Sequence, residues 1–402
     1  MAELTNDQVF ASYKAEDWWR NRTKQVFEIA GRAGTGKTYV IKYILQMLGI
    51  PIKKVLFAAF TGKAATVLAR NGLPAMTTCA AFYEFVPEIC RDENNHMIIL
   101  PNGKPKTKLV KRKLSHLKKS YEAIVIDEST MINDQERTDI ESFGLPIFAL
   151  GDLNQLPPVF GKPAFMNNPD VELRQIMRQS EDDPIVWIAN RIIEGESLSC
   201  GVYGNSCIKK RSDLTELDFK QADMIITGTN KLRHAINQMF REEFKHIVRL
   251  EYPHVGEKVL CVHNNWGRSI GESIFLTNGL TGFVDYVDRE SFNGKRIKID
   301  FRPDFTNKIF RNIVVDYNRL MRTEQFLQTE NNTFGPSDMD QFDWGYAVTC
   351  HKAQGSGWEK VLGLAEMFSG DLDYIRKYLY TMVTRASYGL TLAIERDKIY
   401  LS

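Results

Sequence analysis

The stretch Gly31-Arg32-Ala33-Gly34-Thr35-Gly36-Lys37-Thr38 decides the fold class of this chain. It follows a short apolar run at 26–30 and precedes an apolar-periodic run at 40–45, which is the strand-then-helix context of a phosphate-binding loop. In such a loop the glycines let backbone N–H groups surround a triphosphate, Lys37 reaches the β- and γ-phosphates, and the Thr38 hydroxyl binds magnesium. The sequence therefore predicts a site for ATP and Mg²⁺ at the N-terminus of a helix.

A second motif joins a buried-strand pattern to two carboxylates. The apolar run 123–126 leads directly into Asp127 and Glu128. Asp127 is expected to hold the magnesium ion. Glu128 is expected to orient and deprotonate the attacking water, because hydrolysis needs a base beside the metal ligand whereas a kinase excludes water. The alternative interpretation is that Asp127 caps a helix running through Met131.

Length and composition fit a large enzyme with more than one domain. The chain has 402 residues, a net charge of +2 and six cysteines without a Cys-x-x-Cys pair, so we expect reduced thiols and no structural zinc. No run of about 18 apolar residues occurs, and Glu3 and Asp7 lie where a signal peptide would be basic and then apolar. We expect no membrane insertion, and a cytoplasmic location in a bacterium or, for a phage-encoded chain, in its host.

Strand and helix patterns alternate along the chain. They predict a parallel sheet with helices on both faces from strands at 26–30, 55–59, 123–126 and 147–150. A second α/β lobe is predicted from strands at 222–227, 346–349, 361–364 and 390–394. Between these strands, alternating patterns with little helical periodicity predict a small all-β insertion. We expect a first lobe at 1–178, a second at 179–402 and the insertion at about 283–335.

One local segment is strongly basic. Residues 104–119 contain eight Lys or Arg and no acid. Just before and within it, the apolar run 97–100, the turn Asn102-Gly103 and the run 107–110 predict a β-hairpin. Such a hairpin suits contact with phosphates, whereas a charge run is in general as well explained by a solvated surface.

Further short elements complete an ordered set of motifs. In chain order the set comprises Leu4–Gln8, the phosphate loop, Phe60–Ala65, Thr77-Thr78, Asp127-Glu128, Gly151–Pro158, Gln175–Gln179, Thr229–Lys231, Asn278-Gly279, Thr349–Gly355 and Tyr380–Ala386. This set resembles the superfamily 1 helicases, most closely the RecD-like and bacteriophage Dda-like branch, superfamily 1B, which moves 5′ to 3′ on DNA. The resemblance covers nearly the whole chain.

The resemblance implies an architecture and an activity. The fold class is α/β, with two RecA-like parallel-sheet lobes, a β-hairpin insertion in the first at about 86–118 that acts as a duplex-splitting pin, and a small β-barrel in the second. The activity is that of an ATP-dependent DNA helicase and translocase. Its partners would be single-stranded DNA and duplex junctions, with replication or recombination proteins as candidates, and we expect a monomer.

The resemblance also assigns site residues. Gln155 would sense the γ-phosphate, which Arg178 and Arg385 would contact from across a cleft. The catalytic set comprises Lys37, Asp127, Glu128, Gln155, Arg178 and Arg385. The nucleotide set comprises Gln8, which would read adenine, with Gly34, Thr35, Gly36, Lys37, Thr38, Gly355 and Arg385; Thr38 and Asp127 would hold the metal. The nucleic-acid set comprises Thr61, Lys63, Thr78, Asn230, Asn278, Thr349, His351 and Lys352.

Several alternatives stay open at this point. His351 taken alone suits a core histidine, and Phe82, Tyr83 and Phe85 suit either base stacking or the core. Cys79 stands where many relatives carry a histidine, so one strand contact is in doubt. The alternative functions are an RNA-directed superfamily 1 helicase, a P-loop kinase or NTPase without unwinding activity, and a nucleic-acid-binding scaffold with ATP as a structural ligand.

Overall fold

The computed structural model describes residues 4–92, 95–99, 105, 107–114, 117–157, 163–177, 182–244, 251–271, 274–323, 339–366 and 371–401. Its first lobe is built on a six-stranded sheet in the order β3-β2-β6-β7-β1-β8, and every pairing is parallel. The strands are β1 Val26–Gly31, β2 Val55–Ala59, β3 Ala75–Thr77, β6 Ala123–Asp127, β7 Ile147–Gly151 and β8 Val171–Leu173. The predicted parallel sheet is confirmed.

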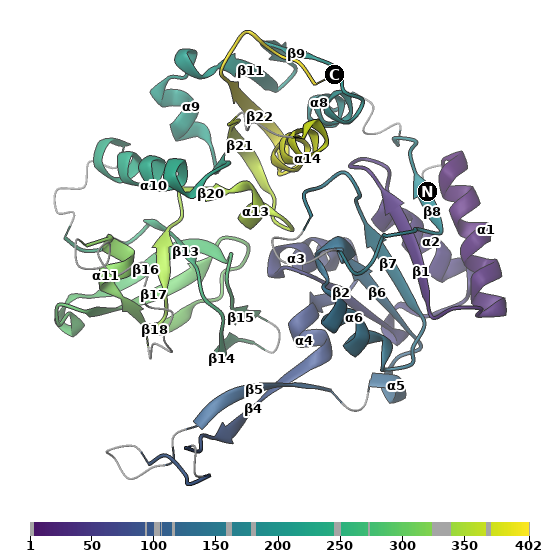
Figure 1. The fold of residues 1–402 in the computed structure, drawn as a ribbon, viewed down its shortest axis with the longest axis horizontal. Coiled ribbons are helices and arrows are strands. Elements are labelled where there is room, and N and C mark those ends of the chain that lie inside the picture. The colour runs from purple at the N-terminus through teal and green to yellow at the C-terminus, as the bar shows by residue number, and fades with distance from the viewer. Residues whose placement is uncertain are drawn as a thin grey trace.

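Helices cover both faces of this sheet, as Figure 1 shows. Alternate residues of β6 explain the arrangement: Ala123 and Val125 belong to one buried apolar cluster, and Ile124 and Ile126 to another on the opposite face. Strands buried on both faces read as continuous apolar runs. The helices are α1 Asn6–Asn21, α2 Lys37–Met47, α3 Gly62–Arg70, α4 Thr78–Phe82, α5 Leu117–Ser120 and α6 Asp134–Glu141.

The second lobe has its own six-stranded sheet, in the order β10-β11-β22-β21-β12-β20. Only the edge pair β10–β11 is antiparallel. The strands are β10 Gly201–Tyr203, β11 Ser206–Lys210, β12 Met224–Thr227, β20 Ala347–Thr349, β21 Trp358–Leu364 and β22 Ala386–Ile394. The helices are α8 Pro184–Ile193, α9 Glu216–Gln221, α10 Asn230–Met239, α13 Cys350–Ala353 and α14 Leu372–Val383, and a short ribbon pairs β9 Leu198–Ser199 with β23 Lys398–Ile399.

An antiparallel sheet with its own core lies beside the second lobe (Figure 1). Its order is β18-β17-β16-β13-β19. The strands are β13 Lys258–Cys261, β16 Thr281–Asp288, β17 Arg296–Pro303, β18 Phe310–Asp316 and β19 Phe342–Trp344, with the hairpin β14 Asn265–Ile270 and β15 Ile274–Leu276 and the helix α11 Tyr317–Met321. The sheet includes β13 and β19, which lie outside the expected range of about 283–335. Both strands are too short to show an alternating pattern in the sequence. The lobe boundary near 178 stays a prediction.

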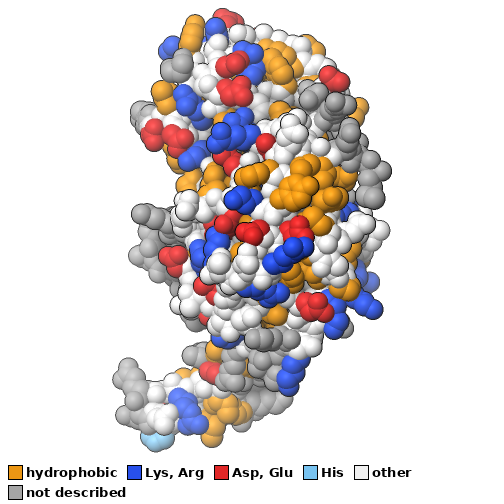
Figure 2. Space-filling view, turned by 90° about the vertical axis from the view of Figure 1, so that its right-hand side faces the viewer, with side chains coloured by type: hydrophobic (Ala, Val, Ile, Leu, Met, Phe, Trp, Pro, Cys, Tyr) orange, Lys and Arg blue, Asp and Glu red, His pale blue; other side chains and the backbone are white. Residues whose placement is uncertain are grey.

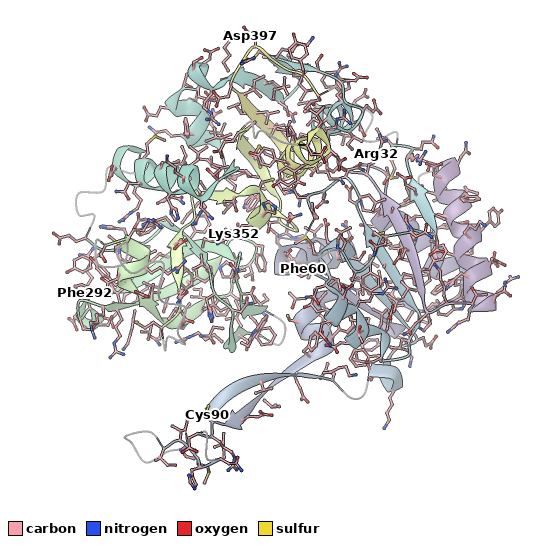
Figure 3. The ribbon with its side chains drawn as sticks, viewed as in Figure 1. Arg32, Phe60, Cys90, Phe292, Lys352 and Asp397 are labelled. Atoms are coloured by element: carbon pink, nitrogen blue, oxygen red, sulfur yellow. The ribbon has the colours of Figure 1, made fainter. Side chains whose placement is uncertain are left out.

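A two-stranded arm projects from the first lobe (Figures 1 and 3, where Cys90 is labelled near its outer end). It pairs β4 Tyr83–Ile89 with β5 Thr107–Lys113, from Tyr83 opposite Lys113 to Ile89 opposite Thr107. The predicted pairing of 97–100 with 107–110 is therefore wrong. Residue Met97 instead bridges to Arg91, and Ile99 to Pro105, because the strand at 83–89 competes for the same partner. The Asn102-Gly103 turn, Lys104 and Lys106 lie outside the described residues.

The outer surface carries both signs of charge. Figure 2 views the molecule from the α1 side and shows Lys and Arg interspersed with Asp and Glu, in keeping with the net charge of +2. Among the described residues, none of the helices combines the length and the apolar character that crossing a bilayer requires.

Packing in the antiparallel sheet leaves no room for a side chain at Gly345. A Cβ there would lie 2.7 Å from the carbonyl carbon and 2.8 Å from the carbonyl oxygen of Val259. We expect Gly345→Ala to lower the free energy of unfolding by about 1–3 kcal/mol, because backbone atoms cannot yield to it. Chemical denaturation measures this. In the control Gly201→Ala the nearest atom is 3.5 Å away, and a loss as large as that of Gly345→Ala would contradict the packing argument.

Candidate nucleotide site and nucleic-acid surface

The phosphate loop connects the end of β1 to the start of α2. Gly34 and Gly36 have φ values of 80° and 75°, a left-handed backbone that glycine adopts without strain. The Lys37 ammonium donates to the carbonyl oxygens of Gly31 (2.7 Å) and Arg32 (3.3 Å). Thr38 is half-buried in the first turn of α2. The loop thus presents a helix N-terminus, a lysine and a threonine together, as the sequence predicted.

Gln8 ties the N-terminal helix to this loop. Its side chain is fully buried, its amide nitrogen donates to the Thr35 carbonyl oxygen (2.9 Å), and its amide oxygen accepts from the Thr5 N–H (3.1 Å). The Thr5 hydroxyl in turn accepts from the Gln8 N–H, which completes a capping box at the start of α1. Gln8 therefore supports the phosphate loop, and reading adenine stays a prediction.

Asp127 and Glu128 lie at the carboxyl end of β6. An Asp127 carboxylate oxygen accepts from the Glu128 N–H (3.0 Å), and Glu128 has a left-handed backbone with φ of 54°. Burial and the adjacent Glu128 raise the pKa of Asp127 to about 6, which Lys37 opposes. The turn Ser129–Met131 has no side-chain cap, so the interpretation of Asp127 as a helix cap is wrong.

Glu128 holds an oxygen without a partner. Its Oε2 is buried and accepts no hydrogen bond from the described residues, which is costly unless a ligand or water completes it. Among the described residues, no group of three or more His, Cys, Asp or Glu side chains is arranged to hold a metal ion. That Thr38 and Asp127 hold magnesium stays a prediction.

Arg385 comes to this site from the second lobe. It follows α14, is 5% exposed, and donates to the carbonyl oxygens of Thr381 (3.0 Å) and Ser356 (3.1 Å). A cleft of about 750 Å³ is lined by Asp127 and Glu128 from the first lobe and by Gly355 and Arg385 from the second. Residues far apart in the sequence thus share one cavity. Arg178, the other expected arginine, lies outside the described residues.

Gln155 lies in a loop that forms hydrogen bonds with the second lobe. The loop follows β7, and Gln155 is 8% exposed. The next residue, Leu156, donates its N–H to the Thr381 hydroxyl (2.8 Å) and accepts from the Gln354 amide (2.5 Å). Gln155 is thus a buried loop residue, and its role in sensing the γ-phosphate stays a prediction.

The first-lobe residues expected to contact nucleic acid differ in their surroundings. Thr61 caps α3 and its hydroxyl donates to the Gly355 carbonyl oxygen across the lobes. Lys63 lines the 750 Å³ cleft, 3.6 Å from Asp304 and 4.3 Å from the centroid of the Trp358 ring, and burial lowers its pKa. Thr78 is only 4% exposed. The structure therefore brings Lys63 to the cleft and leaves little of Thr78 at the surface.

The second-lobe residues expected to contact nucleic acid lie in loops, at the starts of helices or within the short helix α13. Asn230 begins α10 and is exposed, and Asn278 is exposed in the loop after β15. Thr349 is 7% exposed before α13, and His351 and Lys352 are half-buried within it. Burial lowers the pKa of His351. Figure 3 shows Lys352 on the side of the second lobe that faces Phe60 of the first.

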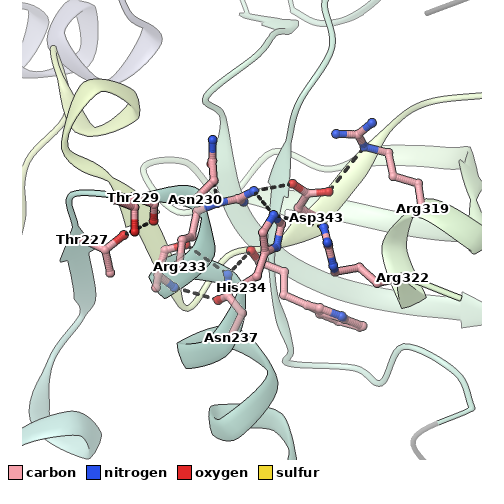
Figure 4. A network of polar contacts seen from close by, with 11 residues as sticks. Thr227, Thr229, Asn230, Arg233, His234, Asn237, Arg319, Arg322 and Asp343 are labelled. Carbon is pink, nitrogen blue, oxygen red and sulfur yellow. Dashed lines mark hydrogen bonds and ion pairs between the residues drawn. The ribbon is translucent and has the colours of Figure 1, made fainter. Parts of the chain in front are cut away.

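Two arginines surround the Asp343 carboxylate (Figure 4), and all three charges act on Lys352. Asp343 accepts from Arg233 (2.9 Å) and lies 3.3 Å from Arg319. Burial, and after it Arg233, lowers the pKa of Lys352 to about 8, although Asp343 opposes the shift. Sequence reasoning missed Arg233 and Arg319. The one available signal was the spacing of Asn230 and Arg233, which places both on one face of α10.

His234 lies between two arginines of this network. Its Nε2 is 3.0 Å from both the Arg233 and the Arg322 guanidinium. Burial, followed by these two charges, lowers the pKa of His234 to about 4, so the ring is neutral at neutral pH and serves as an acceptor.

Two aromatic residues, for which the sequence allowed either base stacking or core packing, belong to the core. Phe82 is 0% and Tyr83 6% exposed, and the Tyr83 hydroxyl donates to Asp139 (3.0 Å). The side chain of Phe85 lies outside the described residues.

Comparisons with known proteins agree with this arrangement. Residues 19–161 match the model of an AAA domain, and residues 345–393 that of the UvrD-like helicase C-terminal domain. The chain is 24% identical to the ATP-dependent RecD2 DNA helicase of Deinococcus radiodurans, over 89% of this chain and 45% of that protein. It is also 24% identical to an uncharacterized protein of Methanocaldococcus jannaschii, over 92% and 36%. The chain thus spans less than half the length of both relatives.

Solved structures share the fold. The Pif1 helicase from Bacteroides, in complex with ADP-AlF3 and ssDNA, has a TM-score of 0.52 at 17% identity, covering 98% of this chain and 94% of that one. The Pif1 helicase from Candida albicans has a TM-score of 0.50 at 16% identity, with the same coverage. Together with the two family models and the RecD2 relative, these likenesses show that the chain is similar to the RecD-like and Pif1-like helicases of superfamily 1B.

Proposed function

We propose that this chain is an ATP-driven motor that moves 5′ to 3′ on single-stranded DNA and separates duplex strands. The observation that carries the proposal is the cleft in which Arg385 of one lobe meets Asp127 and Glu128 of the other. A P-loop phosphotransferase would account for the phosphate loop but would not explain Asp127-Glu128 or the distant Arg385. A site completed from two separate sheets suits an enzyme whose chemistry moves the lobes. We also propose the division of the chain into lobes at 1–178 and 179–402.

The residues of the cleft and of the phosphate loop suit hydrolysis. ATP phosphates would lie in the loop 31–38 with Lys37 on the β- and γ-phosphates, and Thr38 and Asp127 would hold Mg²⁺, which neutralises developing charge. Glu128 offers an unpartnered carboxylate oxygen to the attacking water. Arg385 brings a guanidinium whose position is fixed by three backbone and hydroxyl acceptors, so little reorganisation is needed when it meets the γ-phosphate.

The strand track would run over both lobes. Asn230, Asn278, His351 and Lys352 offer polar and cationic groups on the second lobe, and Thr61 and Lys63 on the first, for sequence-independent phosphate contacts. We propose single-stranded DNA as the substrate because the similar Bacteroides Pif1 structure was solved in complex with ssDNA. The 5′ to 3′ polarity follows the family resemblance. If the lobes alternate their grip while ATP closes the cleft and hydrolysis opens it, the cycle moves the chain one way.

The first prediction concerns the base. Glu128→Gln keeps the shape of the side chain and leaves Asp127 intact, so we expect ATP binding close to normal and strand-stimulated hydrolysis lower by about 100-fold or more. Phosphate release with and without single-stranded DNA measures it. Glu122→Gln is the matched control, because Glu122 is exposed just before the same strand. Normal hydrolysis in Glu128→Gln, or a wild-type rate indifferent to added DNA, would refute the proposal.

The second prediction separates stability from strand binding at Lys352. Its folded pKa of about 8 lies below the ordinary 10.5, so the folded state disfavours the charged form. This penalty is complete below about pH 8 and fades as the pH rises toward 10.5. We expect Lys352→Met to raise the free energy of unfolding at pH 7 by roughly 1 kcal/mol, allowing for solvent screening, with a smaller gain at higher pH.

The same variant should bind single-stranded DNA more weakly, with a smaller dependence of affinity on salt, because one phosphate contact is lost. Fluorescence anisotropy at several salt concentrations and denaturation at pH 7 and 9.5 make the two measurements. Lys360→Met, an exposed lysine of the same lobe, is the control. A variant that is less stable and binds DNA normally would contradict the role of Lys352.

The third prediction concerns the arm. Ile89 and Thr107 are directly paired in β4 and β5, so residues 90–106 can be replaced by an Asn-Gly turn without disturbing the stem. We expect this variant to keep strand-stimulated hydrolysis and to displace streptavidin from a single strand. It should lose most duplex separation, because a wedge acts only where stacking of about 1.4 kcal/mol per step is broken. Equal loss of both activities would place the arm in the strand track instead.

A further inference from the structure

Tyr380 connects the second lobe to the phosphate loop through one oxygen atom. It lies in α14, is 0% exposed, accepts a hydrogen bond from the Ala33 N–H (2.7 Å) and donates one to the Asp152 carboxylate (2.5 Å). Ala33 belongs to the phosphate loop, and Asp152 follows β7. A tyrosine hydroxyl can accept one hydrogen bond while it donates its proton in another, so this single group binds both Ala33 and Asp152.

The surroundings keep this hydroxyl a donor. Burial, followed by the neighbouring Asp152, raises the pKa of Tyr380 far above its usual value. The other Asp152 oxygen accepts from the N–H (3.0 Å) and the side-chain amide (3.3 Å) of Asn154. Asp152 therefore organises the loop that carries Gln155, and Tyr380 fixes Asp152.

The same helix holds the far side of that loop. The Thr381 hydroxyl accepts from the Leu156 N–H (2.8 Å). Consecutive residues of α14 thus hold Asp152 and Leu156, which flank Gln155. A shift of α14 relative to the first lobe must either carry this loop with it or break these hydrogen bonds.

We infer that Tyr380 is a positioning residue that couples the phosphate loop to the Gln155 loop and to the second lobe. The inference rests on the proposed function. Phosphates bind to backbone N–H groups of the loop, and the direction of the Ala33 N–H is set by the Tyr380 hydroxyl. A change in the loop on ATP binding or phosphate loss therefore reaches Asp152 and α14 through this oxygen. Removal of the hydroxyl should disturb the coupling of strand binding to hydrolysis more than the binding of nucleotide.

Tyr380→Phe removes the hydroxyl and keeps the ring. The matched control is Tyr378→Phe: Tyr378 lies in the same helix, is 2% exposed, and its hydroxyl accepts from the Glu366 N–H (3.3 Å) within the second lobe. In Tyr380→Phe we expect affinity for a fluorescent ATP analogue within about twofold of wild type, and kcat at saturating single-stranded DNA lower by about tenfold. The stimulation by DNA should fall with it, whereas Tyr378→Phe should keep the wild-type stimulation.

Melting temperatures and a double-mutant cycle separate this role from a structural one. Asp152→Asn is the second variant, and the kcat losses of Tyr380→Phe and Asp152→Asn should be clearly non-additive, because the first removes and the second weakens the same charge-assisted hydrogen bond. If Tyr380→Phe does not fold, the DNA stimulation of Asp152→Asn decides in its place. DNA stimulation like that of wild type, or equal losses in both tyrosine variants, would overturn the inference alone. A wild-type chain that releases no phosphate would overturn the proposed function, and the inference with it.

Discussion

The docking of α14 against the loops of the first sheet is the contact on which the active site depends. Parallel strands end at one edge of a sheet, so β1, β6 and β7 deliver the phosphate loop, Asp127-Glu128 and the Gln155 loop to one place. These loops all belong to the first lobe, so an arginine that approaches the site from the opposite side must come from the second lobe. The hydroxyls of Tyr380 and Thr381 attach α14 to two of these loops, and Arg385 follows at the end of the same helix.

On the second lobe, the surroundings of Lys352 disfavour its charged form. Asp343 is the carboxylate that faces Arg233 and Arg319, and burial, followed by Arg233, lowers the pKa of Lys352. A protein selected only for stability would neutralise Lys352 or bury an apolar side chain there. An unneutralised cation suits a surface that meets phosphates. Lys63 of the first lobe instead lies inside the cleft, next to Asp304, which follows β17, and the Trp358 ring of β21. An acidic and an aromatic side chain therefore face Lys63, whereas arginines surround the carboxylate near Lys352.

Local patterns predicted the sheets and the phosphate loop because both depend on short-range chemistry. Four apolar runs of the first half became parallel strands, and Asp127-Glu128 ended one of them. The arm was misread because β4 at 83–89 lacks clear alternation, and only the paired partner shows that 107–113 joins it rather than 97–100. The network at Asp343 escaped prediction because its arginines come from α10 and α11, which only the folded chain brings together. Gln8 was assigned to adenine by resemblance, and its bond to Thr35 is visible only in three dimensions.

Strand separation on tailed duplexes shows directly whether this chain is a 5′ to 3′ DNA helicase. Duplexes with a 5′ or a 3′ single-stranded tail, made in DNA and in RNA, would be incubated with the chain, Mg²⁺ and ATP, and the released strand measured. We expect ATP-dependent separation of the 5′-tailed DNA duplex and little separation of the 3′-tailed one. Preference for the 3′ tail would contradict the polarity, and preference for RNA would contradict the substrate. ATP hydrolysis that separates none of the duplexes would contradict the account of this chain as a helicase.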